Sequence, residues 1–189
     1  MPSDLPLTVE TLTAAIAAGL TPKWCLFWGH TPAKDGSITK SVFSQWWAAH
    51  PFTIDGTTYA TAEHWMMAEK ARLFADEEIL AKILTAPHPN EAKKLGRKVR
   101  NFDGSQWLAA RWDIVLRGNL AKFTQHPALR AFLLNTGDRI LVEASPYDQI
   151  WSIGLAATDP IAENPDKWRG LNLLGFALMA VREQLRKTQ

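Results

Sequence analysis

The sequence lacks several features that would place it in a class at once. It has a single cysteine, Cys25, among 189 residues, so no internal disulfide or cysteine-based zinc site is expected, and a reducing compartment is indicated. No apolar run approaches the roughly 20 residues that a membrane-spanning helix needs. The N-terminus shows no basic segment followed by an apolar one, as a signal peptide would. These absences predict a cytoplasmic protein with no membrane segment.

The chain also has little net charge and none of the common nucleotide or metal motifs. Its 21 Lys and Arg against 19 Asp and Glu leave +2, too little to indicate a nucleic-acid coat protein. Neither G-x-x-x-x-G-K-[ST] nor G-x-G-x-x-G occurs, so no P-loop or Rossmann site is predicted. The five histidines form no i,i+4 pair. We therefore expect neither a bound metal nor a cofactor.

What the chain does contain is typical of one soluble globular domain. Hydrophobic residues make up 47%, and 11 Gly and 11 Pro exclude collagen-like and low-complexity chains. A domain of this length buries roughly 70% of its unfolded surface, enough for a core that supports a defined pocket. Nine Trp against two Tyr is unusual. Indole rings bury well and also stack on flat ligands.

Hydrophobic periodicity and capping residues predict a mainly α, single compact domain with a few short strands. Helices are expected over residues 8–18, 61–74, 76–84, 90–99, 106–124, 127–137 and 172–186. Apolar residues on both sides of Asp55-Gly56 predict a β-hairpin over 52–59. Short strands are expected over 139–144 and 149–153, and irregular structure over 24–47 and 159–170.

The first candidate for chemistry lies on the helix predicted over 61–74. Glu63 and Lys70 are seven residues apart, which brings them to nearly the same face at about 100° per residue, with Met66 and Met67 on the same stripe. An acid and a base on an apolar stripe are costly to bury unless they are paired or used. The alternative is that both charges lie in solvent at the edge of the stripe.

Two further segments carry charge in suggestive places. A strand leading into a turn can present Asp148 to a cleft beside Trp151, although turn aspartates often only bond their own backbone. The segment from Lys93 to Arg100 supplies five cations in eight residues. These can hold phosphate oxygens, or they can form a solvated basic helix face.

A set of short motifs runs in order through residues 24–186. The motifs are Phe27-Trp-Gly-His30, Phe43-Ser-Gln-Trp-Trp47, Phe52-Thr-Ile-Asp-Gly56, Thr61-Ala-Glu-His-Trp65 with Lys70, Glu91-Ala-Lys-Lys-Leu-Gly-Arg97, Trp107, Ala121-Lys-Phe123, Leu141-Val-Glu-Ala-Ser-Pro-Tyr-Asp148, Ile150-Trp-Ser-Ile-Gly154 and Asn172-Leu-Leu-Gly175. Together they resemble the NADAR, or YbiA-like, family. We therefore predict a helical extension over 1–23 and a NADAR/YbiA-like domain over 24–189.

The resemblance implies a mostly helical domain that hydrolyses N-glycosidic bonds of ribosylated compounds. Two substrate classes are associated with the family: phosphoribosylamino-pyrimidine intermediates of riboflavin synthesis, and ADP-ribose attached to a nucleobase such as guanine. The implied catalytic residues are Glu63, Lys70 and Asp148. Substrate contacts are expected from Trp107, Trp151, His30 and Arg97.

The chain departs from the family pattern at three places. Gln45-Trp46-Trp47 stands where the family often has Asn-Phe-Tyr, Met66-Met67 where it has Phe-Gln, and Ser152 where Gly is usual. These changes leave the charged groups alone and alter the aromatic lining, so they bear on the substrate more than on the type of reaction.

Two functions of other classes remain open beside the hydrolase. The domain could be a non-catalytic module that binds ADP-ribose or a related nucleotide, or an interaction protein whose Trp-rich surface docks a partner. The expected partner is a small ribosylated nucleotide, with ADP-ribosylated DNA or RNA as a further option, and we expect a monomer or weak dimer. The ordered set of Glu63, Lys70, Asp148 and Trp151 favours the enzyme.

Overall fold

The computed structural model describes residues 5–188, so the first four residues of the predicted extension and the last residue of the predicted domain lie outside it. Within this range the protein is mainly α, as predicted, with two sheets of two strands each. The elements are α1 (Val9–Ala17), β1 (Trp24–Phe27), η1 (Lys40–Phe43), β2 (Phe52–Ile54), β3 (Thr57–Tyr59), α2 (Ala62–Leu73), α3 (Glu77–Leu84), α4 (Pro89–Gly96), α5 (Gly104–Gln125), α6 (Pro127–Leu134), β4 (Ile140–Glu143), η2 (Pro165–Lys167) and α7 (Leu173–Lys187).

Side-chain caps explain where several helices begin. Thr8, Thr61, Asp76 and Asp103 each accept a hydrogen bond from the backbone N–H three residues on, at the starts of α1, α2, α3 and α5. The hairpin β2–β3 turns at Asp55-Gly56, and both residues have positive φ, as the predicted two-residue turn requires.

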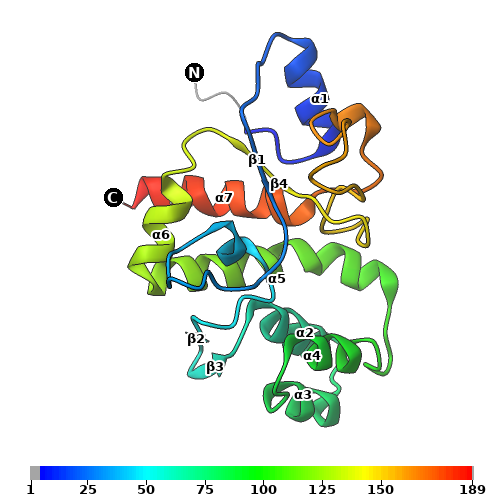
Figure 1. Cartoon of the computed structure of the whole chain (residues 1–189). Coiled ribbons are helices and arrows are strands. Elements are labelled where there is room, and N and C mark those ends of the chain that lie inside the picture. The colour runs from blue at the N-terminus through cyan, green and yellow to red at the C-terminus, as the bar shows by residue number, and fades with distance from the viewer. Residues whose placement is uncertain (1–4, 189) are drawn as a thin grey trace.

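Helix α5 is the centre of the molecule, with elements packed on several sides (Figure 1). It contacts α7 and α6, the hairpin strand β2, and helix α2 of the α2–α4 group. The approach to α2 is close because Gly118 leaves room for Trp65: a Cβ at this position would lie 2.2 Å from Cδ1 of the indole. The arrangement separates the α2–α4 group from the part that holds β1, β4 and α7 (Figure 1).

The expectation of irregular structure over 24–47 is wrong at its start. Residues Trp24–Phe27 form β1, which pairs in parallel with β4, with Trp24 opposite Ile140 and Phe27 opposite Glu143. The four-residue strand has no alternation to mark it, and its partner lies more than a hundred residues along the chain, where no local pattern reveals it. Helix α7 covers β4.

The second short strand, expected over 149–153, is also absent from the described structure. Oδ1 of Asp148 accepts the N–H groups of Ile150 and Trp151, both at 2.8 Å. These bonds fold the backbone into a turn and divert its N–H groups from a strand ladder. The segment therefore presents its side chains from a turn.

At the N-terminal end, α1 packs against η2, near the other end of the sequence. The boundary between extension and domain at residues 23 and 24 stays a prediction. No helix within residues 5–188 is long and apolar enough to cross a membrane.

Candidate functional site

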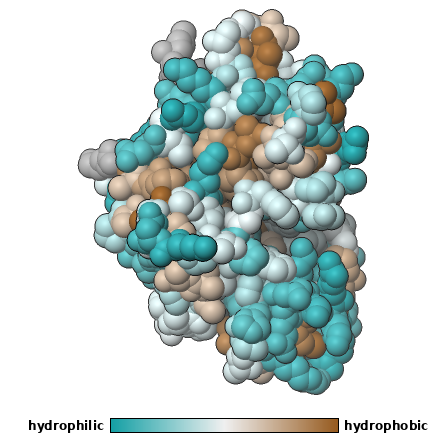
Figure 2. Space-filling model, viewed as in Figure 1, coloured by the Kyte–Doolittle hydropathy of each residue, from teal (hydrophilic) through white to brown (hydrophobic). Residues whose placement is uncertain are grey.

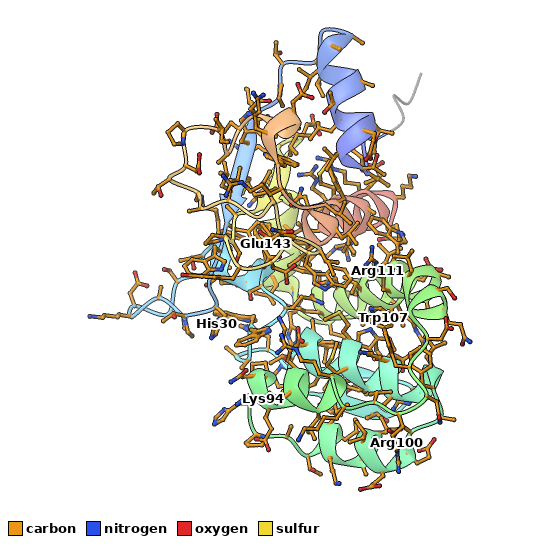
Figure 3. The ribbon with its side chains drawn as sticks, turned by 90° about the vertical axis from the view of Figure 1, so that its right-hand side faces the viewer. His30, Lys94, Arg100, Trp107, Arg111 and Glu143 are labelled. Carbon is orange, nitrogen blue, oxygen red and sulfur yellow. The ribbon has the colours of Figure 1, made fainter. Side chains whose placement is uncertain are left out.

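A cavity of about 1040 Å³ lies between the α2–α4 group and the end of β4. In Figure 3, Glu143 lies above the α2–α4 group, on the side of β4, and Trp107 lies near the start of α5. The lining includes every side chain that the sequence analysis named for the site: Glu63, Lys70, Asp148, Trp107, Trp151, His30 and Arg97. Their presence on one cavity is a matter of geometry; the role of each stays a prediction.

Glu63 is held in the first turn of α2 and is almost completely buried, with 3% of its surface exposed. Its backbone N–H donates to the Gln45 carbonyl at 2.9 Å, and its Oε2 accepts from the Trp46 indole at 3.3 Å. Burial raises the pKa of Glu63 to about 7, although Lys93 and the Trp46 N–H act in the opposite direction. The alternative that this carboxylate lies in solvent is therefore wrong.

Asp148 combines the two roles that the sequence left open. One carboxylate oxygen, Oδ1, holds the turn by accepting the N–H groups of Ile150 and Trp151 at 2.8 Å. The same residue lines the cavity, and its negative charge raises the pKa of Glu63. The turn therefore fixes a carboxylate at the edge of the cavity beside Trp151.

A third carboxyl group in the cavity, Glu143, was missed as a candidate. It ends β4, where its N–H donates to Oδ1 of Asn172 at 3.0 Å. Burial, with Asp148 and Glu63 nearby, raises the pKa of Glu143 to about 8. Its place at the carboxyl end of a predicted strand, five residues before Asp148, was the signal that could have found it.

Lys70 lies on the same cavity, at the C-terminal end of α2. Its ammonium is 4.2 Å from the centroid of the Phe102 ring and 5.7 Å from that of the Trp107 ring. It makes no ion pair within residues 5–188. Partial burial, and secondarily the positive charge of Arg97, lower the pKa of Lys70. Such an amine has a larger neutral, nucleophilic fraction than an exposed lysine.

The basic segment divides between the cavity and solvent. Lys93 and Arg97 line the cavity, whereas Lys94 and Lys98 are exposed, and the surface over α3 and α4 is mostly hydrophilic (Figure 2). Arg100 forms an ion pair with Asp76 instead. The cations that reach the cavity are therefore fewer than the five in the segment.

Gly96 allows α4, with Lys93 and the adjoining Arg97, to pack close to α2. A Cβ at Gly96 would lie 2.0 Å from Sδ of Met67, so α4 can approach α2 this closely only without a side chain there. Lys93 and Arg97 flank this point on the cavity lining, and the Lys93 ammonium is 5.8 Å from the centroid of the Trp46 ring. Lys93 thus lies near both the Glu63 carboxylate, whose pKa its charge lowers, and the Trp46 indole.

Aromatic side chains complete the lining. Beside Trp107 and Trp151, the cavity is lined by Trp28, Trp46 and Tyr147. Of these three, only Trp46 was noted from the sequence, as a change in the aromatic lining. The His30 and Trp46 rings lie with their centroids 5.4 Å apart. Within the described range, no group of three or more His, Cys, Asp or Glu side chains is arranged to hold a metal ion. The cavity thus combines carboxyl groups, amines and indoles.

Comparison with known proteins gives consistent results. An N-glycosidase of Acanthamoeba polyphaga mimivirus is 41% identical over 168 residues, covering 87% of this chain and 97% of the relative. The N-glycosidase YbiA of Escherichia coli is 34% identical over 138 residues, covering 73% and 78%. The NMR structure of E. coli YbiA superposes with a TM-score of 0.71 at 30% identity, covering 89% of this chain and 88% of that one. The NADAR domain model matches residues 26–186, and the chain belongs to the NADAR domain family.

Proposed function

We propose that the protein is an N-glycosidase, a hydrolase that cleaves the bond between C1′ of a ribose and the nitrogen of a nucleobase-like amine. The observation that carries this proposal is the convergence of Glu63, Glu143, Asp148 and Lys70 on one cavity walled by indoles. The names of the mimivirus and E. coli relatives support it. A passive binding module has no need of three carboxyl groups and an amine in one place.

The proposed reaction develops opposite charges on the sugar and on the departing base, and the cavity contains carboxyl groups suited to each. Cleavage of C1′–N develops positive charge on the sugar and negative charge on the departing base. A carboxylate near C1′ stabilises the sugar cation or activates the attacking water, a part for Glu63 or Asp148. A protonated carboxyl group near the base supplies the proton that the base takes up on leaving. Glu143 fits this part, because its pKa of about 8 keeps it protonated at neutral pH.

Lys70 provides a second route. Its neutral amine attacks C1′, the C1′–N bond breaks, and the base leaves with a proton; opening of the sugar ring then gives a Schiff base, which water hydrolyses. Borohydride reduces such an intermediate to a stable adduct. We expect a trapped adduct in the wild type and none in Lys70→Ala, measured by mass spectrometry. No adduct, together with intact activity in Lys70→Ala, would dispose of this route and leave the direct attack of water.

The substrate is proposed to be a ribosylated nucleotide of one of two kinds: a phosphoribosylamino-pyrimidine intermediate of riboflavin synthesis, or ADP-ribose on a nucleobase such as guanine, free or in DNA or RNA. Lys93 and Arg97 on the cavity lining are suited to phosphate oxygens. A volume of about 1040 Å³ is at the upper end of the usual range of roughly 300–1,000 Å³ for ligand sites, so there is room for either kind.

The decisive experiment is to incubate the protein with each substrate and to identify the products by chromatography. We expect release of the free base or amine from at least one of them. Glu63→Gln should lower turnover by at least ~10²-fold, the low end of general acid–base contributions, while Glu10→Gln, an exposed change on α1, should leave it unchanged. Binding without product release from either substrate would favour the ADP-ribose-binding module instead.

A further inference from the structure

A lysine far inside the protein carries no role in the chemistry above. Lys122 lies on α5 with 1% of its surface exposed. Its Nζ donates to the carbonyls of Val42 at 2.6 Å and Ser44 at 3.1 Å. Burial lowers the pKa of Lys122 to about 7, and no acidic side chain of the described structure offsets it. Burying an amine in this way costs free energy, so the presence of a lysine at this place in the core calls for an explanation.

Asn119, one turn earlier on the same helix, binds Gln45, the residue that follows Ser44. Its Nδ2 donates to Oε1 of Gln45 and to the Val115 carbonyl, both at 2.9 Å. Asn119 is completely buried, and so are both of its bonds. Lys122 and Asn119 together fasten the segment Val42–Trp46 to α5 at three residues: Val42, Ser44 and Gln45.

The fastened segment in turn holds Glu63. The Gln45 carbonyl accepts the Glu63 N–H at 2.9 Å, and the Trp46 indole donates to Glu63 Oε2 at 3.3 Å. Ser44, Gln45 and Trp46 also line the cavity. A continuous path of hydrogen bonds and a short stretch of backbone therefore leads from the Lys122 amine to the carboxylate of Glu63.

We propose that Lys122 is a positioning residue, which together with Asn119 holds the segment Val42–Trp46 so that Gln45 and Trp46 fix Glu63 at the cavity. The consequence for turnover rests on the N-glycosidase function proposed above, whereas the positioning of Glu63 does not. The Trp46 bond is particular to this chain's pattern, because the side chain of the Phe that the family often has at this position carries no N–H group.

The influence of Lys122 on Glu63 passes through position and not through charge. The charges that shift the pKa of Glu63 are Lys93 on α4, Arg97 directly after α4, and Asp148 in the turn after β4. Lys122 is absent from this set, and the residue whose pKa its charge affects is His50. Replacing Lys122 by an apolar side chain therefore changes the titration of Glu63 only if the segment moves.

The test follows the Trp46 indole in ¹⁵N-tryptophan-labelled protein by NMR, with the signal assigned from Trp46→Phe. In the wild type this signal should shift with pH around the Glu63 pKa of about 7, and Glu63→Gln, which keeps Lys122, should remove that shift and so assign it to Glu63. In Lys122→Met we expect the signal to move and its midpoint to rise by about 0.5–1 pH unit, because a hydrogen bond that favours the carboxylate is weakened. Turnover should fall by about 10-fold, in kcat more than in KM, as expected for misplacement of a reacting group.

Two further variants make the result decisive. Lys187→Met removes the same charge from an exposed position on α7 and should leave the Trp46 signal unchanged. Asn119→Leu removes the bond to Gln45, and it tests the same claim if Lys122→Met does not fold. A folded variant of either buried residue with the wild-type Trp46 signal, midpoint and turnover would overturn the proposal. Because the NMR measurement needs no substrate, it still decides the matter if the protein proves to have no N-glycosidase activity.

Discussion

At the scale of single residues, burial sets the proton affinity of the acids in the cavity. Glu63 and Glu143 lie near each other in one cavity, and their pKa values are raised to about 7 and about 8. Groups whose surroundings separate their proton affinities are suited to divide acid and base roles between them. For the function proposed above, we therefore expect the less acidic group, Glu143, to donate the proton and Glu63 to be the group that ionises near neutral pH.

This division predicts the effect of Glu143→Gln. The amide keeps the size and a donor N–H but has no proton to give, so we expect turnover to fall by about 10²-fold. We also expect the wild-type rate to fall above about pH 8, where Glu143 loses its proton, and this alkaline limb to be absent from the variant. Steady-state rates from pH 5 to 10 measure both effects.

The control for this change is Glu163→Gln, an exposed position outside the large cavity. It should retain the wild-type rate and profile. A Glu143→Gln protein that is folded and keeps the alkaline limb would assign that limb to another group.

At the scale of secondary-structure elements, the contact between α5 and α2 depends on Gly118. The Trp65 ring lies where a Cβ would be, and it is fixed there by a hydrogen bond from Nε1 to the Ile114 carbonyl at 2.7 Å. We expect Gly118→Ala to lower the free energy of unfolding by about 1–3 kcal/mol, as overpacked cores do. Gly104→Ala, at the open start of α5, should be neutral or slightly stabilising. Denaturant unfolding of the two variants measures the difference; equal stabilities would mean that the indole moves aside freely.

The elements that could be predicted from the sequence are those whose signals are local. Caps such as Thr61 and Asp103 and the Asp55-Gly56 turn lie within a few residues of what they determine, and the helices and the hairpin they mark are present. Strand β1 depends on a partner at 140–143, which no local pattern reveals. The turn at Asp148 is local, but the residues after it fit a short strand as well, and the Asp148 carboxylate binds the N–H groups that a strand would use.

The same distinction holds for the site. All seven candidate residues line the cavity. They came from helix spacing, from a predicted turn, from a basic segment and from motif matches. Glu143 was missed, although it ends a predicted strand, because its place at the site comes from a parallel strand pair. Trp46 was noted only as a change in the aromatic lining, and its bond to Glu63 comes from a segment fastened to α5. Sequence periodicity indicates which face of a helix or strand a residue lies on. It does not indicate which distant segment packs against that face.

At the scale of the whole molecule, the acids of the cavity reduce stability above neutral pH. A carboxyl group with a pKa of about 7 when folded and about 4.3 when unfolded takes up a proton on folding between these values. Its contribution to stability is therefore present at low pH and is lost as the pH rises through about 7.

Glu63→Gln removes the ionisable carboxyl group, and with it the loss of stability as the pH rises through about 7. We expect the variant to be more stable than the wild type at pH 8, on the order of 1–3 kcal/mol, and close to it at pH 4 to 5. Denaturant midpoints at the two pH values check this. A gain of equal size at both would show that proton uptake by Glu63 has no part in the balance.

The cavity walls come from segments spread along the chain, from Trp28 after β1 to Trp151 beyond β4. A polypeptide still growing on the ribosome already carries Glu63 and Lys70, but β1 has no partner strand until residues 140–143 emerge. Partial products of translation, or fragments cut between these regions, thus hold the reactive side chains without the chamber that gathers them. The cavity lining is therefore complete only after the residues up to Trp151 have been synthesised.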